Sequence, residues 1–342
     1  MNVRQTAQHC FRRASGVTLI ELMVALSIGS FLMIGAVTVF MQSRTTFRVT
    51  ESVSRLQENA RFVLDALEPD IRMASYFGLT SRSNKIQGRA TPLDPIPAGL
   101  GIGGDCGPNW TISVAEEVGG TNNGYAWACA AYGGAPQPAA DTFVVRRVSQ
   151  GPIAGPLDAG TLYLQSARFQ DSQLFVGSIL PAGYLPTTSQ THRYMANGYY
   201  VSSNSSLDTP GNNVPSLRMK TLIGGALGPR IVDREVLPGV EDFQVQFGID
   251  TDLVGAPNRG SIDRYIDPDD PILNPLSAGF NPDVTILAVR VWFRLRAQRP
   301  ENGFTDTTNY IYADQNIPAP GDQFRRAVVS KTIYLRNART PV

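Results

Sequence analysis

Near its N-terminus the chain carries one acidic side chain inside an otherwise apolar run. From Val17 to Met41 the only ionisable residue is Glu21. A carboxylate within a membrane costs up to about 2.5–3.5 kcal/mol on insertion scales, less near the interface than at the centre, and such a residue is a functional candidate by default. Glu21 is therefore the first candidate for chemistry. The plainer interpretation is a carboxyl group that is lifted to the lipid headgroups or protonated.

The apolar run is long enough to cross a membrane. A helix over 17–41 would be about 37 Å long, which exceeds the ~30 Å hydrocarbon core. The preceding segment carries Arg4, Arg12 and Arg13 and no acidic residue, which predicts that it stays in the cytoplasm and that the rest is exported. A secretory signal would place its small-residue cleavage site after the apolar core, whereas Ala14-Ser15-Gly16 precedes it.

Two cysteines, Cys106 and Cys129, lie in the exported part, while Cys10 lies in the N-terminal segment. In an exported chain such a pair most simply forms one disulfide. It would close part of a Gly- and Pro-rich irregular segment, 88–138, and contribute roughly 3 kcal/mol in the chain-entropy account. The spacing fits no CxxC metal site, so a metal or nucleophile role is the weaker interpretation.

Catalytic chemistry has little support in these residues. The only histidine beyond the N-terminal segment is His192, so a Ser-His-Asp or Cys-His system would depend on one residue. The sequence has no HExxH motif, no P-loop and no GxGxxG between a strand and a helix. His192 lies in a polar, loop-like context, and we expect it at the surface. We expect no enzyme, no small-molecule substrate and no cofactor.

An acidic segment that also contains prolines is a weak candidate for a metal site. It holds Asp263, Asp267, Asp269 and Asp270. Calcium prefers carboxylate oxygens, but the spacing is not that of an EF-hand and the closing Glu is missing. A solvated acidic loop is the favoured interpretation.

The net charge argues against a general attraction to nucleic acid. The formal charge is +1, and removal of the three arginines of the N-terminal segment leaves 1 − 3 = −2. A local stripe of arginines could still share one solvent-facing side of a sheet and contact DNA phosphates or an acidic partner. We treat DNA binding as the weaker hypothesis. The arginines are Arg290, Arg294, Arg296, Arg325, Arg326 and Arg336.

Helical periodicity continues beyond the apolar run. Apolar residues recur at steps of mostly three and four from Phe40 to Ala74, with charged residues on the other faces. Segment 42–77 is therefore predicted to be an amphipathic helix that packs on the globular part of the same chain. Pro69 is expected to end or kink it near Glu68.

From Gly78 onward the pattern changes to strands and turns. Glu241–Ile249 alternates between apolar and polar residues, which predicts a half-buried strand. Val284–Arg296 is predicted to be a long central antiparallel strand with one wet face towards its end. The absence of helical patterns between strands predicts an antiparallel sheet and an α+β fold. Further strands are predicted at 142–149, 161–169, 173–179, 199–202, 217–223, 231–237 and 326–336.

The segment Gly16-Val17-Thr18-Leu19-Ile20-Glu21-Leu22, which follows a short basic leader, resembles the class III signal of type IV pilins and pseudopilins. The resemblance implies cleavage between Gly16 and Val17 by prepilin peptidase and N-methylation of Val17, which stands where the family usually has Phe. It also implies that Glu21 acts in assembly. A carboxylate buried among packed helices needs a cation, and the N-terminal ammonium of a neighbouring subunit would be the nearest.

The C-terminal part carries a second resemblance. Segments 239–248, 289–296 and 324–337 resemble the PilW family of minor pilins, which is related to the J-type minor pseudopilins of type II secretion. The resemblance implies a subunit that joins other minor pilins and the major pilin, primes pilus assembly and reaches the filament tip, often beneath a large adhesin. The alternatives are a J-type pseudopilin and, less favoured, a DNA- or surface-binding pilin.

The expected organisation has four parts: a cytoplasmic leader at 1–16, a membrane helix at 17–41, a periplasmic amphipathic helix at 42–77 and a β-rich globular domain at 78–342. Removing the leader leaves 342 − 16 = 326 residues, enough to bury a core. By resemblance, the helix packs on the sheet as in a pilin lollipop. The protein would cross the inner membrane of a Gram-negative bacterium once, and later reach the cell surface in a pilus.

Overall fold

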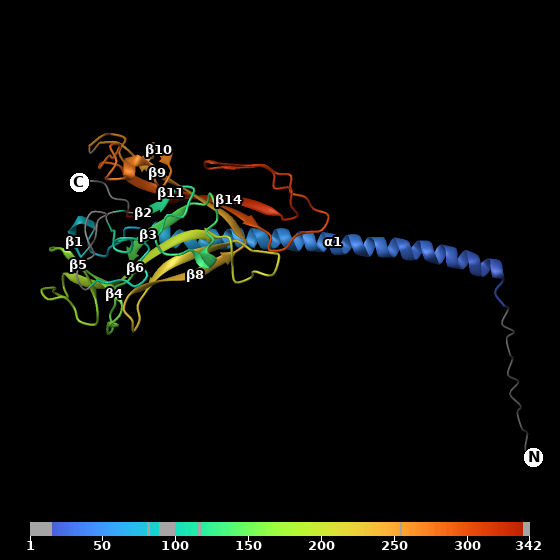
Figure 1. The fold of residues 1–342 in the computed structure, drawn as a ribbon, viewed down its shortest axis with the longest axis horizontal. Coiled ribbons are helices and arrows are strands. Elements are labelled where there is room, and N and C mark those ends of the chain that lie inside the picture. The colour runs from blue at the N-terminus through green and yellow to red at the C-terminus, as the bar shows by residue number, and fades with distance from the viewer. Residues whose placement is uncertain are drawn as a thin grey trace, which may run out of the picture. The chain divides into compact units, whose positions relative to one another are not determined.

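The computed structural model describes residues 16–80, 83–88, 100–114, 116, 118–253 and 255–337. The predicted leader, apart from Gly16, therefore lies outside the described residues. The chain divides into two units, Met1–Val53 and Ser54–Val342. The fold is α+β, as predicted: one long helix, α1 (Leu19–Arg72), precedes a globular part made mostly of strands (Figure 1).

In the first unit, α1 is apolar and exposed. None of the side chains in its most apolar window is buried, and the helix is long and apolar enough to cross a membrane. Large side chains such as Leu19, Phe31 and Val39 are more than two-thirds exposed. An apolar surface of this extent in water would be strongly unfavourable, so it requires lipid or other apolar helices around it.

In the second unit, the last part of α1 packs into the core. Leu56, Ala60, Val63, Leu67 and Ile71 are buried at steps of three and four, the spacing of one helix face. They pack in one hydrophobic cluster with residues of the strands described below. The predicted packing of an amphipathic helix on a sheet is therefore confirmed for this part of the chain.

Pro69 does not end the helix near Glu68. α1 continues one turn further, to Arg72, and stops before residue 77, the predicted limit. Proline removes only one N–H from the helix, and the last turn is held in other ways. The Met73 N–H donates to the Pro69 carbonyl at 3.2 Å, and the Arg336 N–H donates to the Arg72 carbonyl at 3.1 Å.

The first sheet has eight strands in the order β1-β5-β4-β6-β3-β2, with β7 beside β6 and β8 beside β7. All neighbours are antiparallel except the short β1–β5 pair. The long strand β6 joins the two halves, because its start pairs with β4 and its end pairs with β3 and β7. The strands are β1 Ile86–Gln87, β2 Val118–Thr121, β3 Thr142–Val148, β4 Leu162–Ala167, β5 Ser172–Val176, β6 Ser189–Ser202, β7 Ser216–Ile223 and β8 Arg230–Pro238.

The second sheet has the order β10-β9-β11-β14. Its central strand β11 pairs with β9 and β14 in antiparallel register, as the alternation in the sequence predicts. Val289, Val291, Phe293 and Leu295 are buried in the core cluster that also contains the end of α1. The strands are β9 Val240–Asp250, β10 Arg264–Ile266, β11 Thr285–Arg296 and β14 Arg326–Tyr334, and a separate hairpin is formed by β12 Tyr310–Tyr312 and β13 Gln315–Ile317.

Strand β6 begins at Ser189, ten residues before the predicted strand at 199–202. Its first half does not show the apolar alternation of a strand, because several of its buried residues are polar and form hydrogen bonds with other polar side chains. The Thr191 hydroxyl donates to the Gln165 side chain at 2.5 Å, and Gln165 donates in turn to the Ser189 hydroxyl at 3.0 Å. The two- to four-residue strands β1, β2, β10, β12 and β13 are too short to show a period, and none was predicted.

Candidate functional site

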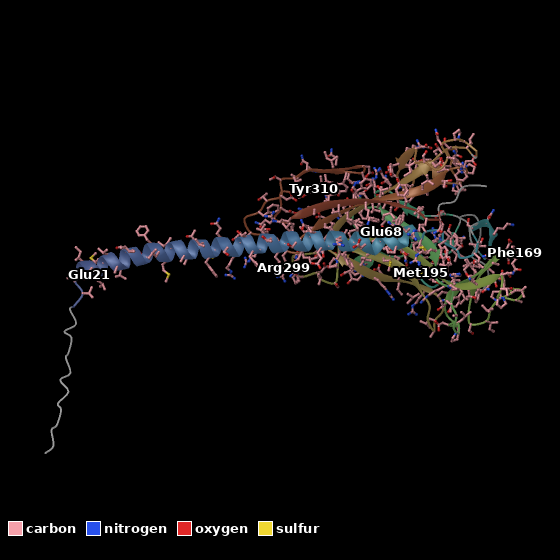
Figure 2. The ribbon with its side chains drawn as sticks, turned by 180° about the vertical axis from the view of Figure 1, so that it is seen from behind. Glu21, Glu68, Phe169, Met195, Arg299 and Tyr310 are labelled. Atoms are coloured by element: carbon pink, nitrogen blue, oxygen red, sulfur yellow. A yellow bond between two sulfur atoms is a disulfide. The ribbon has the colours of Figure 1, made fainter. Side chains whose placement is uncertain are left out.

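The residues expected to act in processing and assembly lie at the start of α1 (Figure 2). Gly16 and Val17 precede the helix and are exposed, Val17 at 68%. The backbone between them is therefore not held in a helical hydrogen-bond ladder, which suits a bond that a peptidase must reach.

Thr18 caps this end of the helix and also contacts Glu21. The Thr18 hydroxyl oxygen accepts a hydrogen bond from the Glu21 N–H at 3.3 Å, and the hydroxyl donates to Oε2 of the Glu21 carboxylate at 3.5 Å. Thr and Glu three positions apart are a known helix-start signature, and a negative charge is favourable at this end of the helix dipole. Sequence reasoning did not single out Thr18, although the T-x-x-E spacing could have revealed it.

The arrangement at Glu21 can accept a cation. Within the described residues no basic side chain lies within ion-pair distance of its carboxylate, which is exposed to the surroundings of the helix. In apolar surroundings such a carboxylate would be destabilised until a cation from outside this part of the chain reached it.

Cys106 and Cys129 form the predicted disulfide, with an S–S distance of 2.07 Å. It lies in a group of aromatic residues: the Trp110 and Trp127 rings are 5.5 Å apart, and the Tyr125 hydroxyl donates to the Cys129 carbonyl at 2.7 Å. The bond therefore closes a loop within the segment between β1 and β3.

Asp70 of α1 forms a buried polar joint that the sequence analysis missed. Its carboxylate accepts hydrogen bonds of 2.6 Å from Arg147 of β3 and from Asn197 and Tyr199 of β6. Asn197 accepts in turn from the Thr221 hydroxyl of β7 at 2.6 Å. One available signal was position, because Asp70 falls on the buried stripe of the helix, three residues after Leu67.

Arg326 of β14 forms a second buried joint. Its guanidinium group pairs with Glu241 of β9 at 2.6 Å, with Asp306 at 3.0 Å and with Asp322 at 2.7 Å, and its side chain is 3% exposed. Asp306 also accepts from the Tyr310 hydroxyl at 2.8 Å. Burial first, and then the bonded Asp306, raise the pKa of Tyr310 to about 12, so it stays a donor at neutral pH. These contacts fasten segment 297–325, which carries Tyr310 (Figure 2), to the second sheet.

The expectation that the arginines share one solvent-facing side of a sheet is wrong. Segment 297–325 covers the face of β11 that was predicted to be wet, because Arg294 lies 5.7 Å from the centroid of the Tyr310 ring and Arg296 lies 4.2 Å from that of Phe324. Arg325 pairs with Glu301 at 2.5 Å. Arg290 stacks on Tyr265 at 3.6 Å, and Arg336 is exposed in the turn after β14. Most of these arginines therefore contact other parts of the protein: three aromatic rings, those of Tyr310, Phe324 and Tyr265, and several carboxylates lie against them.

The four aspartates of the predicted acidic loop do not come together. Asp263 instead joins Asp250 and Asp252, with one carboxylate oxygen of each lying within 4.8 Å of the others. Asp267 accepts from Gln246 at 3.2 Å. Asp270 accepts from the Ile272 N–H at 2.9 Å and so caps the short helix η3 (Pro271–Leu273), while Asp269 is exposed.

His192 is not at the surface. It lies in β6, is 1% exposed, and its Nδ1 donates to the Ser149 carbonyl at 3.0 Å. Burial lowers the pKa of the imidazole, so it is neutral at pH 7. The expectation of a surface loop is wrong because the polar residues around it belong to the first half of β6.

Two comparisons with protein families match this chain. The profile of the prokaryotic N-terminal methylation motif matches residues 11–37, which include Gly16, Val17 and Glu21. The profile described as type IV pilus-assembly protein W matches residues 198–337, from the end of β6 through the whole second sheet and the Arg326 joint. No curated protein and no solved structure gives a significant match. The chain thus carries a match to the PilW family of type IV pilus-assembly proteins over residues 198–337 and a prepilin-type N-terminal motif, and together these support a PilW-family type IV pilin.

Proposed function

We propose that this protein is a minor pilin that co-assembles with other minor pilins, primes type IV pilus assembly and lies at or near the filament tip. The observation that carries the proposal is the Glu21 carboxylate, exposed at the start of an apolar helix and without a basic partner in the described residues. A carboxylate in that setting gains most from a cation supplied by another chain.

The N-terminal ammonium of a neighbouring pilin is the cation that suits this role. Cleavage between Gly16 and Val17 by prepilin peptidase creates such an ammonium at the start of each subunit, and methylation of Val17 leaves its charge in place. The leader arginines Arg4, Arg12 and Arg13 keep this end in the cytoplasm. The protein is then a single-pass protein of the inner membrane with its globular part in the periplasm until it enters a filament.

The size of the globular part favours the tip. A mature chain of 342 − 16 = 326 residues would not tile densely along a thin fibre of small major pilins. A J-type minor pseudopilin of type II secretion would use the same N-terminal chemistry, but the match to the pilus-assembly family over residues 198–337 favours the pilus. An adhesin above this subunit would be its partner at the tip.

The test is Glu21→Ala in the full chain, with Glu58→Ala as the matched control, because Glu58 is an exposed glutamate on the same helix. A buried ammonium without its partner costs about 3–5 kcal/mol, so co-purification with other minor pilins and the number of pili should fall about a hundredfold or more. The control should assemble normally, and both variants should remain in the membrane fraction. Assembly of Glu21→Ala at the wild-type level would contradict the proposal.

Two further measurements test its separate parts. Sequencing of the mature N-terminus should begin at Val17, and any other start would contradict the cleavage site. Immunogold labelling of sheared pili should mark filament ends. Label spaced along the shaft as often as at the ends would remove the tip assignment.

A further inference from the structure

Two arginines follow the apolar run on α1, and the nearest acidic residue, Glu51, comes three residues after the second of them. Between Leu22 and Thr50 the only charged residues are Arg44 and Arg48. They are one helical turn apart and both are exposed. Like charges at this spacing repel each other and weaken the helix, so an anion between them would be stabilising.

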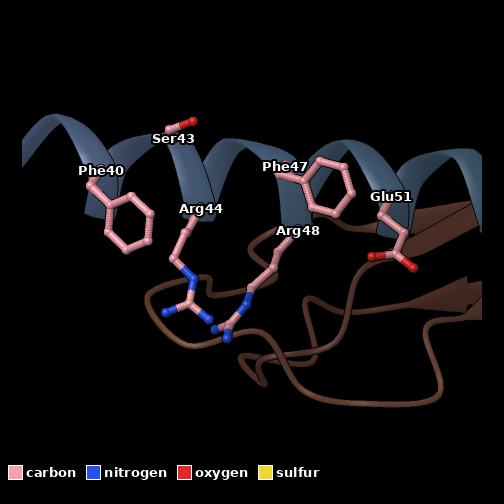
Figure 3. Close-up of a pocket in the computed structure, with 6 residues that line it drawn as sticks. All are labelled: Phe40, Ser43, Arg44, Phe47, Arg48 and Glu51. Carbon is pink, nitrogen blue, oxygen red and sulfur yellow. The ribbon is translucent and has the colours of Figure 1, made fainter.

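Figure 3 shows how the two side chains lie. Both guanidinium groups extend from the same side of the helix and lie side by side, while the Glu51 carboxylate lies apart from them. The Arg44 guanidinium is 5.6 Å from the centroid of the Phe40 ring, a cation–π distance. Phe40 and Phe47 flank the pair and are 60% and 70% exposed. Exposed aromatic rings beside long cationic side chains are typical of the interface between a membrane and water.

The position along the helix also fits this interface. Arg44 and Arg48 follow Met41, the end of the apolar run, by three and seven residues, or about 5 Å and 10 Å along the axis. The polar headgroup layer is about 5–8 Å thick on each side of the hydrocarbon core. Flexible arginine side chains from these two positions can therefore reach the phosphates of one leaflet.

We propose that Arg44 and Arg48 together bind the phosphate of an anionic phospholipid in the leaflet on the exported side of the membrane. This inference rests on the membrane topology proposed above. A guanidinium group presents a planar fork of N–H donors that matches phosphate oxygens, and two forks one turn apart can share one headgroup. The contact would hold the subunit in the membrane until it moves into a filament.

A lipid explains the arginines better than a carboxylate from a neighbouring helix does. Basic residues are disfavoured on the exported side of a membrane helix. The presence of Arg44 and Arg48 there therefore requires a stabilising contact that the membrane itself provides before assembly. The flanking Phe40 and Phe47 would insert beside the same headgroup. A carboxylate of another pilin would engage the pair only after assembly.

The test uses the full chain in neutral-detergent micelles, titrated with phosphatidylglycerol or with phosphatidylcholine of the same acyl chains. Native mass spectrometry measures the bound lipid. The wild type should retain more phosphatidylglycerol than phosphatidylcholine. The double variant Arg44→Gln with Arg48→Gln should weaken that binding on the order of thirtyfold, which corresponds to about 1 kcal/mol for each basic residue at an anionic surface.

Two further variants serve as controls. Arg193→Gln with Arg299→Gln removes the same charge from exposed positions of the other unit and should leave lipid binding unchanged. Arg44→Lys with Arg48→Lys keeps the charge but loses the fork, and should fall between the wild type and the glutamine variant. Circular dichroism checks that every variant is folded.

Several results would overturn the inference. One is a wild type that does not distinguish the two lipids, and another is an equal loss in the Arg193 and Arg299 control. Displacement of the lipid by millimolar inorganic phosphate would indicate a site for free anions. Unchanged lipid binding together with lost cross-linking to another pilin would assign the pair to a subunit contact. None of these depends on Glu21: failure of the Glu21→Ala test would reject the assembly proposal and leave the lipid measurement standing.

Discussion

The Asp70 carboxylate of α1 accepts a hydrogen bond of 2.6 Å from the Tyr199 hydroxyl of β6, 129 residues later in the chain. Burial first, and then the charge of Asp70, raise the pKa of Tyr199, so the hydroxyl keeps its proton and remains a donor. Arg147 and Asn197 bind the same carboxylate. Because these directional bonds add to apolar packing, they fix how the end of α1 lies against the first sheet.

Asp70→Asn should destabilise the globular unit strongly. The substitution leaves the guanidinium of Arg147, which is 15% exposed, without its anion, and breaking a buried pair from one side costs about 3–5 kcal/mol. Urea unfolding of the detergent-solubilised chain, followed by circular dichroism, measures the loss. Asp65→Asn is the matched control, since the Asp65 side chain is 59% exposed and forms a surface ion pair with Arg61 at 3.6 Å. Equal effects of the two substitutions would contradict a structural role for Asp70.

The Arg326 joint should make stability depend on acid pH. Hydrogen bonds from Arg326 hold the pKa of Asp322 below its ordinary value of 3.8. Burial acts in the opposite direction on Asp306, but bonds from Tyr310, the Thr308 N–H and Arg326 outweigh it and lower the pKa of Asp306 as well. Carboxylates with lowered folded-state pKa values stabilise the fold above 3.8, and this contribution is lost as the pH falls through those lowered values.

The measurement is the thermal midpoint at pH 7, 5, 4 and 3 for the wild type and Arg326→Gln. The difference between the wild type and the variant, which isolates the contribution of Arg326, should be nearly constant from pH 7 to 5 and shrink below pH 4. The variant should be less stable at pH 7 by about 3–5 kcal/mol, because Asp306 and Asp322 lose their cation while Glu241 keeps its pairs with Arg294 and Arg296. Its acid decline should be shallower. Parallel pH profiles would show that the joint does not carry the acid sensitivity.

Removal of the disulfide should lower the free energy of unfolding, because the bond restrains the segment that carries the aromatic group. Cys106→Ser with Cys129→Ser opens a link between residues 23 positions apart, and its loss should cost about 3 kcal/mol in the chain-entropy account. The free energy of unfolding from denaturant curves gives the loss. Reduction of the wild type by dithiothreitol should lower stability by a similar amount, whereas reduction of the double variant should have no effect. An unchanged wild type after verified reduction would contradict the prediction.

Gly198→Ala should be destabilising because the first sheet approaches two indole rings at this position. A Cβ at Gly198 would lie 2.6 Å from Trp110 and 2.7 Å from Trp127, and overpacking of this kind costs about 1–3 kcal/mol. Tryptophan fluorescence reports the displacement, and urea unfolding reports the loss. Gly155→Ala is the matched control, since a Cβ there meets nothing within 4 Å, and a variant at Gly198 as stable as this control would refute the close approach.

Much of the fold could be predicted from local patterns. The apolar run with Glu21, the alternation of Phe243, Val245 and Phe247 in β9 and the central place of β11 all follow from periods of 3.6 and 2 within short stretches. The pairing of Cys106 with Cys129 could be predicted because a chain that is expected to be exported leaves few alternatives for two cysteines. These features depend on neighbours in the sequence or on composition, and so they can be predicted without coordinates.

The polar interior could not be predicted in this way. Asp70, Arg294 and Arg326 belong to residue types that usually lie at the surface, and His192 lies among polar neighbours in the sequence. They are buried because their partners come from distant parts of the chain: Glu241 is 85 residues away from Arg326. A buried charge is tolerated only where such partners converge. The sequence by itself determined the long apolar helix, its single acid and the core strands. The tertiary structure alone decided which charged residues are buried, because burial depends on contacts between distant segments.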